Sequence, residues 1–181
     1  TPGDLTGRGC LDLTYNSPST SDIDALVIND AADLRMNATG LSISFWAKFS
    51  DFTAGLNHSL IYKISSSGND AEYYLFYDRV NNALSFRIND VASSIYTDRY
   101  VGRKVTSISS TISDVTKWYH IVVACDGNTT TPDIKIYIDG VRKDNSNDNF
   151  SPSYSHSNRI SSNNVYIGSR GLGSAATDLR G

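Results

Sequence analysis

The stretch KWYHIVVACDGNTTTPDIKIYIDG, residues 117–140, decides the fold that we expect of this chain. It contains two apolar runs, and an Asp-Gly pair directly follows each of them, at Asp126-Gly127 and at Asp139-Gly140. In the second run apolar and polar residues alternate, which is typical of a strand with one buried face. Because glycine readily adopts the positive φ of a tight turn, both pairs are interpreted as corners of a β structure rather than as catalytic or metal-binding aspartates.

The composition of the 181 residues also favours strands over helices. Aspartate accounts for 18 of the 19 acidic residues, glutamine is absent and 11 tyrosines are present, so strong helix formers are scarce. The length fits one domain, which can bury a core without disulfide bonds. The two cysteines, Cys10 and Cys125, are expected to be buried free thiols, and a bridge between them stays open as the alternative.

Alternation of apolar and polar residues predicts several further strands. The clearest is LSISFWAKF, residues 41–49, in which Trp46 lies on the outward face. The runs at 72–79 and 83–88 flank Asn81-Asn82, which predicts a hairpin. The run WYHIVVAC is apolar on both faces and is therefore expected to be a central strand. Other strands are expected at 10–15, 25–28, 59–64, 134–138 and 165–168, with one more within 94–102 and a long exposed loop at 144–164.

About ten short strands joined by polar loops predict an all-β, antiparallel β-sandwich of the jelly-roll type. The pieces that allow a closer identification are, in order, LSISFWAKF, LIYKI, the YYLFYD…ALSFRI hairpin, KWYHIVVACDG, IKIYIDG and VYIGSRG. Their order and spacing resemble those of the laminin-G-like, concanavalin A-like jelly rolls of lectins, pentraxins and related modules.

The resemblance covers residues 10–181, and residues 1–9 are expected to be a linker or a processed end. Members of the family usually continue, after a final glycine, with a strand that carries an Ile-Asp-Glu-Val-like motif. This chain ends at LRG instead. The domain is therefore expected to belong to a larger protein, or to have its sheet edge completed by a neighbour.

Several hydrolases share this fold, and a glycosidase needs two carboxyl groups that flank the bond it cuts. The resemblance implies that such an enzyme would carry two glutamates around an aspartate on one strand, but Glu72 is the only glutamate here. The three histidines, His58, His120 and His156, are accompanied by no Gly-x-Ser-x-Gly elbow. We therefore expect no catalytic residues and no enzymatic activity.

Calcium is the one cofactor that the sequence suggests. Many relatives hold Ca²⁺ at a rim of the sandwich, and the ion takes about 6 to 8 oxygen ligands. Asp22 and Asp24 lie on one face of an extended segment, and together with Asp30 they are the candidate ligands. Asp148 marks a second candidate place. The alternative is that these aspartates cap turns and face solvent.

Sugar recognition uses aromatic faces for stacking and polar side chains for the hydroxyl groups. Outward aromatic residues beside polar loops are the candidates, and Trp46 lies on a sheet face in the same way. The alternative is that these rings cover the sheet or pack beneath long loops. The candidate ligand-binding residues are Tyr74, Tyr96, Tyr100, Tyr137 and Tyr154.

Charge and hydropathy narrow the expected partners. The net charge is −3 and the basic residues form no run, so no nucleic-acid partner is expected. No apolar stretch approaches the roughly 20 residues of a membrane span, so no membrane insertion is expected. We expect a calcium-assisted carbohydrate-binding or adhesion module that meets a glycan or glycoprotein at an extracellular, cell or virion surface. The alternative is a structural or decoration domain held by contacts with neighbouring protein subunits.

Overall fold

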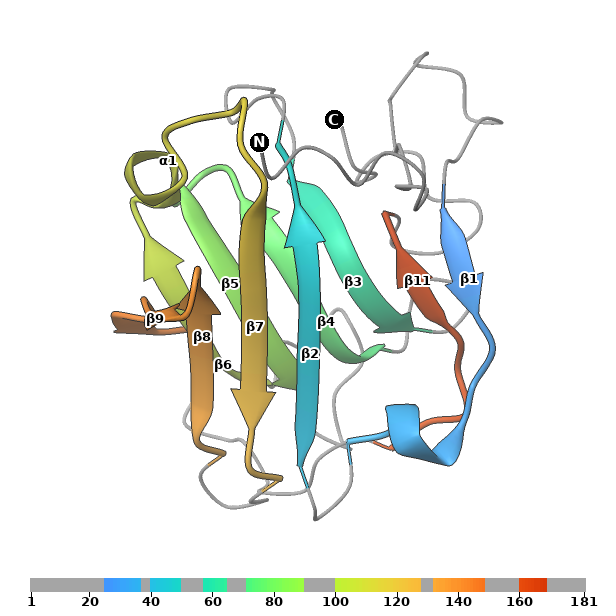
Figure 1. The fold of residues 1–181 in the computed structure, drawn as a ribbon. Helices are drawn as coiled ribbons and strands as arrows, with labels where there is room; N and C mark the ends of the chain where they lie inside the picture. The colour runs from blue at the N-terminus through green and yellow to red at the C-terminus, as the bar shows by residue number, and fades with distance from the viewer. Residues whose placement is uncertain are drawn as a thin grey trace.

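The computed structural model describes residues 25–36, 40–49, 57–64, 71–89, 100–127, 132–148 and 160–168. These residues form two antiparallel sheets that face each other as two layers (Figure 1). The helices among them are short, namely the 3₁₀ helix η1 (Ala32–Leu34) and α1 (Ile108–Thr111). Neither has the length or the apolar character that a membrane-spanning helix requires. The predicted all-β sandwich is confirmed.

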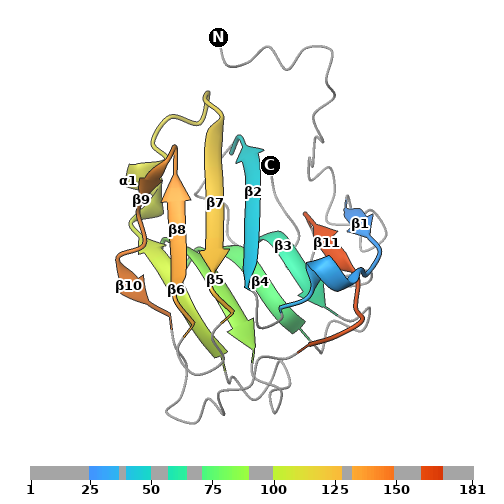
Figure 2. The same ribbon diagram turned by 60° about the horizontal axis from the view of Figure 1, so that its bottom comes forward.

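The larger sheet has seven strands in the order β1-β11-β3-β4-β5-β6-β10, and the smaller sheet has four in the order β2-β7-β8-β9. Figure 2 shows the two layers from a second direction. In chain order the strands are β1 (Leu26–Ile28), β2 (Leu41–Ala47), β3 (His58–Ile64), β4 (Ala71–Asp78), β5 (Ala83–Asn89), β6 (Tyr100–Thr106), β7 (Tyr119–Cys125), β8 (Ile134–Ile138), β9 (Val141–Arg142), β10 (Ser146–Asn147) and β11 (Val165–Ile167).

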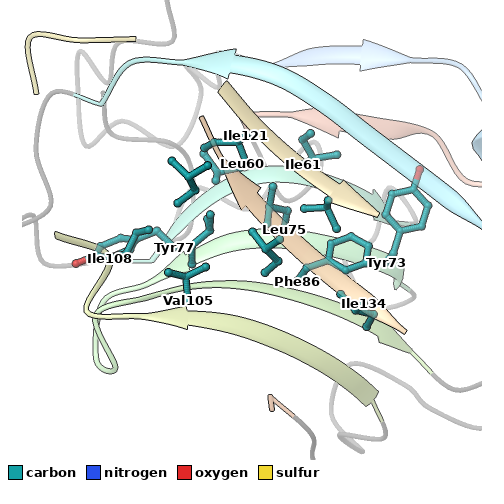
Figure 3. Packing of buried hydrophobic residues seen from close by; sticks show 14 of the residues in the cluster. Leu60, Ile61, Tyr73, Leu75, Tyr77, Phe86, Val105, Ile108, Ile121 and Ile134 are labelled. Carbon is teal, nitrogen blue, oxygen red and sulfur yellow. The ribbon is translucent and has the colours of Figure 1, made fainter. Parts of the chain in front are cut away.

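The core lies between the sheets and is built from alternate residues of their strands. Leu75 and Phe86 of the larger sheet gather with Ile121 and Ile134 of the smaller sheet in this space (Figure 3). Each of them is at most 2% exposed. Full burial of one such side chain is worth about 1.5–3 kcal/mol relative to exposure, so the alternation seen in the sequence supplies the main stabilising term.

Both Asp-Gly pairs are corners, as predicted. Asp139 (φ 51°) and Gly140 (φ 77°) form the two-residue turn between β8 and β9. Two successive positive φ angles are the geometry of a type I′ hairpin turn. The Asp139 carboxylate also accepts a hydrogen bond from the backbone N–H of His120 at 2.9 Å. Gly127, the second residue after β7, has a φ of 72°.

The structure corrects three details of the predicted strands. β7 is central, between β2 and β8, but only one of its faces is fully buried, so its burial alternates. The strand expected within 94–102 is β6, which lies later in the sequence. The segment 144–164 was expected to be a loop, yet it contains β10, whose polar residues pair with β6. Cys125 is a buried free thiol, whereas Cys10 and the strand expected at 10–15 lie outside the described residues.

Candidate functional site

A row of aromatic and charged residues crosses the outer face of the larger sheet. The strand register aligns Tyr166 with Tyr62, Tyr62 with Tyr74, Tyr74 with Arg87 and Arg87 with Gly102. Because side chains alternate along a strand, this row faces away from the core that the neighbouring residues fill. The rings of Tyr62 and Tyr74 stack, with centroids 5.1 Å apart and an interplanar angle of 23°. Tyr62 and Tyr166 are buried, and Tyr74 is half-buried.

Arg87 is the centre of this face. Its guanidinium carbon lies 4.2 Å from the ring centroid of Tyr100, 4.6 Å from that of Phe76 and 5.9 Å from that of Tyr74. A cation over an aromatic face is attracted by the ring quadrupole. The guanidinium also donates two hydrogen bonds to Asp148, from Nε to Oδ2 at 2.7 Å and from Nη2 to Oδ1 at 3.2 Å. We call Tyr74, Phe76, Arg87, Tyr100 and Asp148 the Arg87 site.

The Arg87 guanidinium keeps its positive charge at any ordinary pH. Burial lowers the pKa of the Arg87 guanidinium, but its hydrogen bond to Asp148 and its interaction with Tyr74 outweigh that effect and raise the pKa above its usual value. The Lys104 ammonium lies 3.7 Å from Oδ1 of the Asp148 carboxylate, the oxygen that also accepts from Arg87 Nη2. Asp148, a candidate calcium ligand in the sequence, is thus surrounded by two cationic side chains in the structure.

A glycine allows Asp148 to come this close to the sheet. The backbone N–H of Asp148 donates to the Gly102 carbonyl at 2.9 Å. A Cβ atom at position 102 would lie 2.5 Å from the Phe86 carbonyl oxygen, 2.9 Å from the Asp148 carbonyl oxygen and 3.1 Å from the Arg87 Cγ. Any side chain at this position would therefore push Asp148 and Arg87 out of place.

The structure brings together two of the predicted ligand-binding tyrosines. Tyr74 and Tyr100 both lie against Arg87. Tyr137 lies on the smaller sheet instead. Tyr96 and Tyr154 lie outside the described residues. The sequence analysis did not single out Arg87, because its partner Asp148 lies 61 positions away and only the pairing of β6 with β10 brings them together.

A second aromatic surface lies on the outer face of the smaller sheet. Trp46 is 55% exposed, and its ring stacks on that of His120 at a centroid distance of 5.0 Å. The Ser44 hydroxyl oxygen lies 2.8 Å from His120 Nε2. The outward position predicted for Trp46 is confirmed. This Trp46 surface, formed by Ser44, Trp46 and His120, offers one open ring but no ion pair that could orient a ligand.

Asp30, a candidate calcium ligand, takes part in an ionic cluster. Arg35 Nε donates to Asp30 Oδ2 at 3.1 Å, and the fully buried Lys63 donates to Asp30 Oδ1 at 2.5 Å. The hydrogen bond from Arg35 and then that from Lys63 lower the pKa of Asp30 to about 2. The described part of the chain contains no cluster of three or more His, Cys, Asp or Glu side chains that could hold a metal ion. Asp22 and Asp24 lie outside the described residues, so the calcium site stays a prediction.

The single glutamate serves the same cluster. Glu72 is fully buried, accepts hydrogen bonds from the backbone N–H groups of Met36 and Ser161, and lies 3.9 Å from Lys63 Nζ. Burial raises the pKa of Glu72, while these N–H groups and Lys63 act in the opposite direction. Its carboxylate ties the segments around Met36 and Ser161 to β4, which is a structural role.

The sequence and the fold were compared with those of known proteins. A laminin-G-type family model, described as the concanavalin A-like lectin/glucanases superfamily, matches residues 21–181. Among solved structures, the chain is similar in fold to the CBM40 module of the Ruminococcus gnavus IT-sialidase, which was solved bound to α2,3-sialyllactose. The two share 10% sequence identity, the match covers 81% of this chain and 73% of that chain, and the TM-score is 0.50. No curated protein matches the sequence.

Proposed function

Because the chain belongs to the concanavalin A-like lectin/glucanases superfamily, we propose that it is a non-catalytic carbohydrate-binding module whose ligand contacts the Arg87 site. The family match supports this function, as does the similarity in fold to a carbohydrate-binding module. Glycans are displayed at extracellular, cell and virion surfaces, and we propose that the module acts there, in recognition or adhesion.

The observation that carries the proposal is that aromatic rings surround the hydrogen-bonded pair of Arg87 and Asp148. Sugars present C–H faces that stack on rings and hydroxyl groups that need directed donors and acceptors. Asp148 holds the plane of the Arg87 guanidinium and leaves further N–H donors of the same group for a ligand. Tyr74 is half-buried and 18% of the Arg87 side chain is exposed, so a ligand can reach both residues.

Stability alone does not explain this ion pair. Largely buried ion pairs contribute little to folding, because removing both charges from water costs about as much as their attraction returns. Arg87 and Asp148 lie on the outer face of the larger sheet, so their pairing does not join the two sheets across the main core either. Because the pair is already held in place, its side chains lose little further entropy when a ligand binds, which favours a role in recognition.

The geometry of the Arg87 site favours binding over hydrolysis. A glycosidase places two carboxyl groups on either side of the scissile bond, about 5–10 Å apart. Of the residues that form the Arg87 site, Asp148 is the only carboxylic acid, and its oxygens face Arg87 and Lys104.

The test compares one aromatic deletion on each sheet. After a glycan array has identified a ligand, titration calorimetry measures its affinity for the wild type, Tyr74→Ala and Trp46→Ala. We expect Tyr74→Ala to weaken binding about tenfold, which corresponds to about 1.4 kcal/mol, and Trp46→Ala to bind like the wild type. Thermal melting of both variants separates lost contact from lost folding.

The opposite pattern would move the ligand to the Trp46 surface. If Trp46→Ala abolished binding while Tyr74→Ala retained it, the Arg87 site would not be the contact surface. A wild-type protein that bound no glycan on the array would contradict the proposed function itself.

One observation favours the alternative of a structural domain held by protein contacts. β1 lies at an edge of the larger sheet, and its residues Leu26, Val27 and Ile28 are 44%, 37% and 37% exposed. Edge strands are usually protected by a charge, a proline or a bulge. The β1 sequence contains no such residue, so this edge is suited to pairing with a neighbouring subunit.

A further inference from the structure

The cations at the Arg87 site outnumber the anions. Arg87 and Lys104 both approach Asp148, at 2.7 Å and 3.7 Å, and among the described residues neither forms an ion pair with a second carboxylate. Arg87, the adjacent Lys104 and Asp148 together therefore carry one more positive than negative charge. Only 18% of the Arg87 side chain and 21% of the Lys104 side chain are exposed, so solvent screens this charge incompletely.

A hydroxyl group without a partner lies on the same face. Ser85 is two residues before Arg87 in β5, so both side chains point to the same side of the sheet. The register places Ser85 between Phe76 of β4 and Lys104 of β6. Ser85 is fully buried and its Oγ has no hydrogen-bond partner. Buried hydroxyl groups almost always have a partner, which an ordered water or another bound molecule would supply here.

We infer that the Arg87 site takes an anionic sugar, one that carries a carboxylate or a sulfate group. An anion would give the second cation its missing partner. A neutral sugar would stack on the same rings but would leave the extra positive charge uncompensated. This inference rests on the proposed function and names the ligand class of that site.

The experiment measures the affinity of the full chain for matched oligosaccharides by titration calorimetry. The probes are trigalacturonate, its neutral methyl ester and a sulfated galactose trisaccharide. We expect the protein to bind at least one of the two anionic probes more tightly than the methyl ester, and the anionic probe that binds identifies the source of the charge. Lys104→Gln should weaken binding of that probe about fivefold, which corresponds to about 1 kcal/mol, and Lys104→Arg should restore it.

Lys48→Gln is the matched control. Lys48 is an exposed lysine that follows β2 of the other sheet, so its loss removes the same charge without touching the Arg87 site. Its affinity for the anionic probe should equal that of the wild type. An equal loss in both variants would show a general charge effect and would overturn the inference.

The two proposals fail in different ways. If the methyl ester bound as tightly as the anionic probes, or if Lys104→Gln left the anion's affinity unchanged, the anionic ligand would be wrong while carbohydrate binding stood. If neither the probes nor any glycan on an array bound, the proposed function would be contradicted and the inference would fall with it.

Discussion

At the scale of single residues, Gly102 shows how a position without a side chain can build a site. It lies in β6 at the end of the Tyr166–Tyr62–Tyr74–Arg87 row, where the backbone N–H of Asp148 donates to its carbonyl. In the sequence, Gly102 has no charged or aromatic side chain that would indicate a role in the site. The spacing of Asp148 from Arg87, and so the geometry of the ion pair, depends on this gap.

Gly102→Ala should therefore weaken both folding and binding. The added Cβ would lie 2.5 Å from the Phe86 carbonyl oxygen, so the backbone must shift, at a cost of about 1–3 kcal/mol. Thermal melting should show the loss of stability, and calorimetry should show weaker glycan binding because Asp148 moves. Gly140→Ala is the control, because its Cβ would meet nothing within 4 Å. Gly140→Ala should lose some stability, because alanine is disfavoured at the φ of 77° that Gly140 adopts, but it should bind the glycan normally. Normal binding by Gly102→Ala would show that the spacing of Asp148 does not matter.

At the scale of elements, the segment of β1 and η1 is attached to the sandwich by polar contacts as well as by the packing of Leu34 against the core. β1 is exposed, and η1 contains no buried residue. The Asp30 carboxylate holds Lys63, and the Tyr73 hydroxyl donates to the Leu34 carbonyl at 2.9 Å. Because protonation of a carboxylate breaks an ion pair but does not affect an apolar contact, the stability of this attachment depends on pH.

Asp30→Asn should flatten the acid side of the stability curve. The pKa of Asp30 is lowered from 3.8 to about 2 in the folded chain, because it accepts hydrogen bonds from Arg35 and Lys63. The folded state therefore binds the proton less readily than the unfolded state, and this contribution to stability is present above the unfolded pKa. It is lost as the pH falls from about 4 towards about 2. Urea unfolding at a series of pH values measures the slope for both proteins. An equal slope for Asp30→Asn and the wild type would show that Asp30 does not carry this dependence.

The strands differ in how far the sequence predicts them, and the reason is physical. β2 and β8 have a clear period of two in the sequence, and their burial alternates in the same way. β10 consists of a serine and an asparagine, and it is a strand only because β6 lies beside it. The Arg87 site depends on the register of four strands, which no local pattern encodes. Aromatic content predicts that a tyrosine such as Tyr74 is a candidate, but not which charged residue it meets.

At the scale of the whole molecule, the edge strand β1 and the Arg87 site are separate features of the larger sheet, near opposite edges of its strand order. This separation lets two functions be tested independently.

Val27→Lys places a charge on the exposed apolar edge. If the domain associates through β1, light scattering after size exclusion should show an oligomer for the wild type and a monomer for Val27→Lys. Glycan affinity should be unchanged. A wild type that is monomeric at every concentration would remove the support for the structural alternative.

Calcium is also best tested on the whole molecule, because its proposed ligands Asp22 and Asp24 precede β1 by only a few residues. An ion that binds the folded state alone stabilises it by an amount that grows with the ratio of free ion to dissociation constant. Removal of calcium with EDTA should then lower the melting temperature, and added calcium should restore it, whereas magnesium should not because it demands a tighter octahedral shell. The double variant Asp22→Asn, Asp24→Asn is the control and should melt at the same temperature with and without EDTA. Since the Asp30 carboxylate is already paired with Arg35 and Lys63, Asp30→Asn should leave the effect of EDTA intact. An unchanged melting curve of the wild type in EDTA would remove these aspartates as calcium ligands, and any glycan binding would then rest on the Arg87 site without help from a metal.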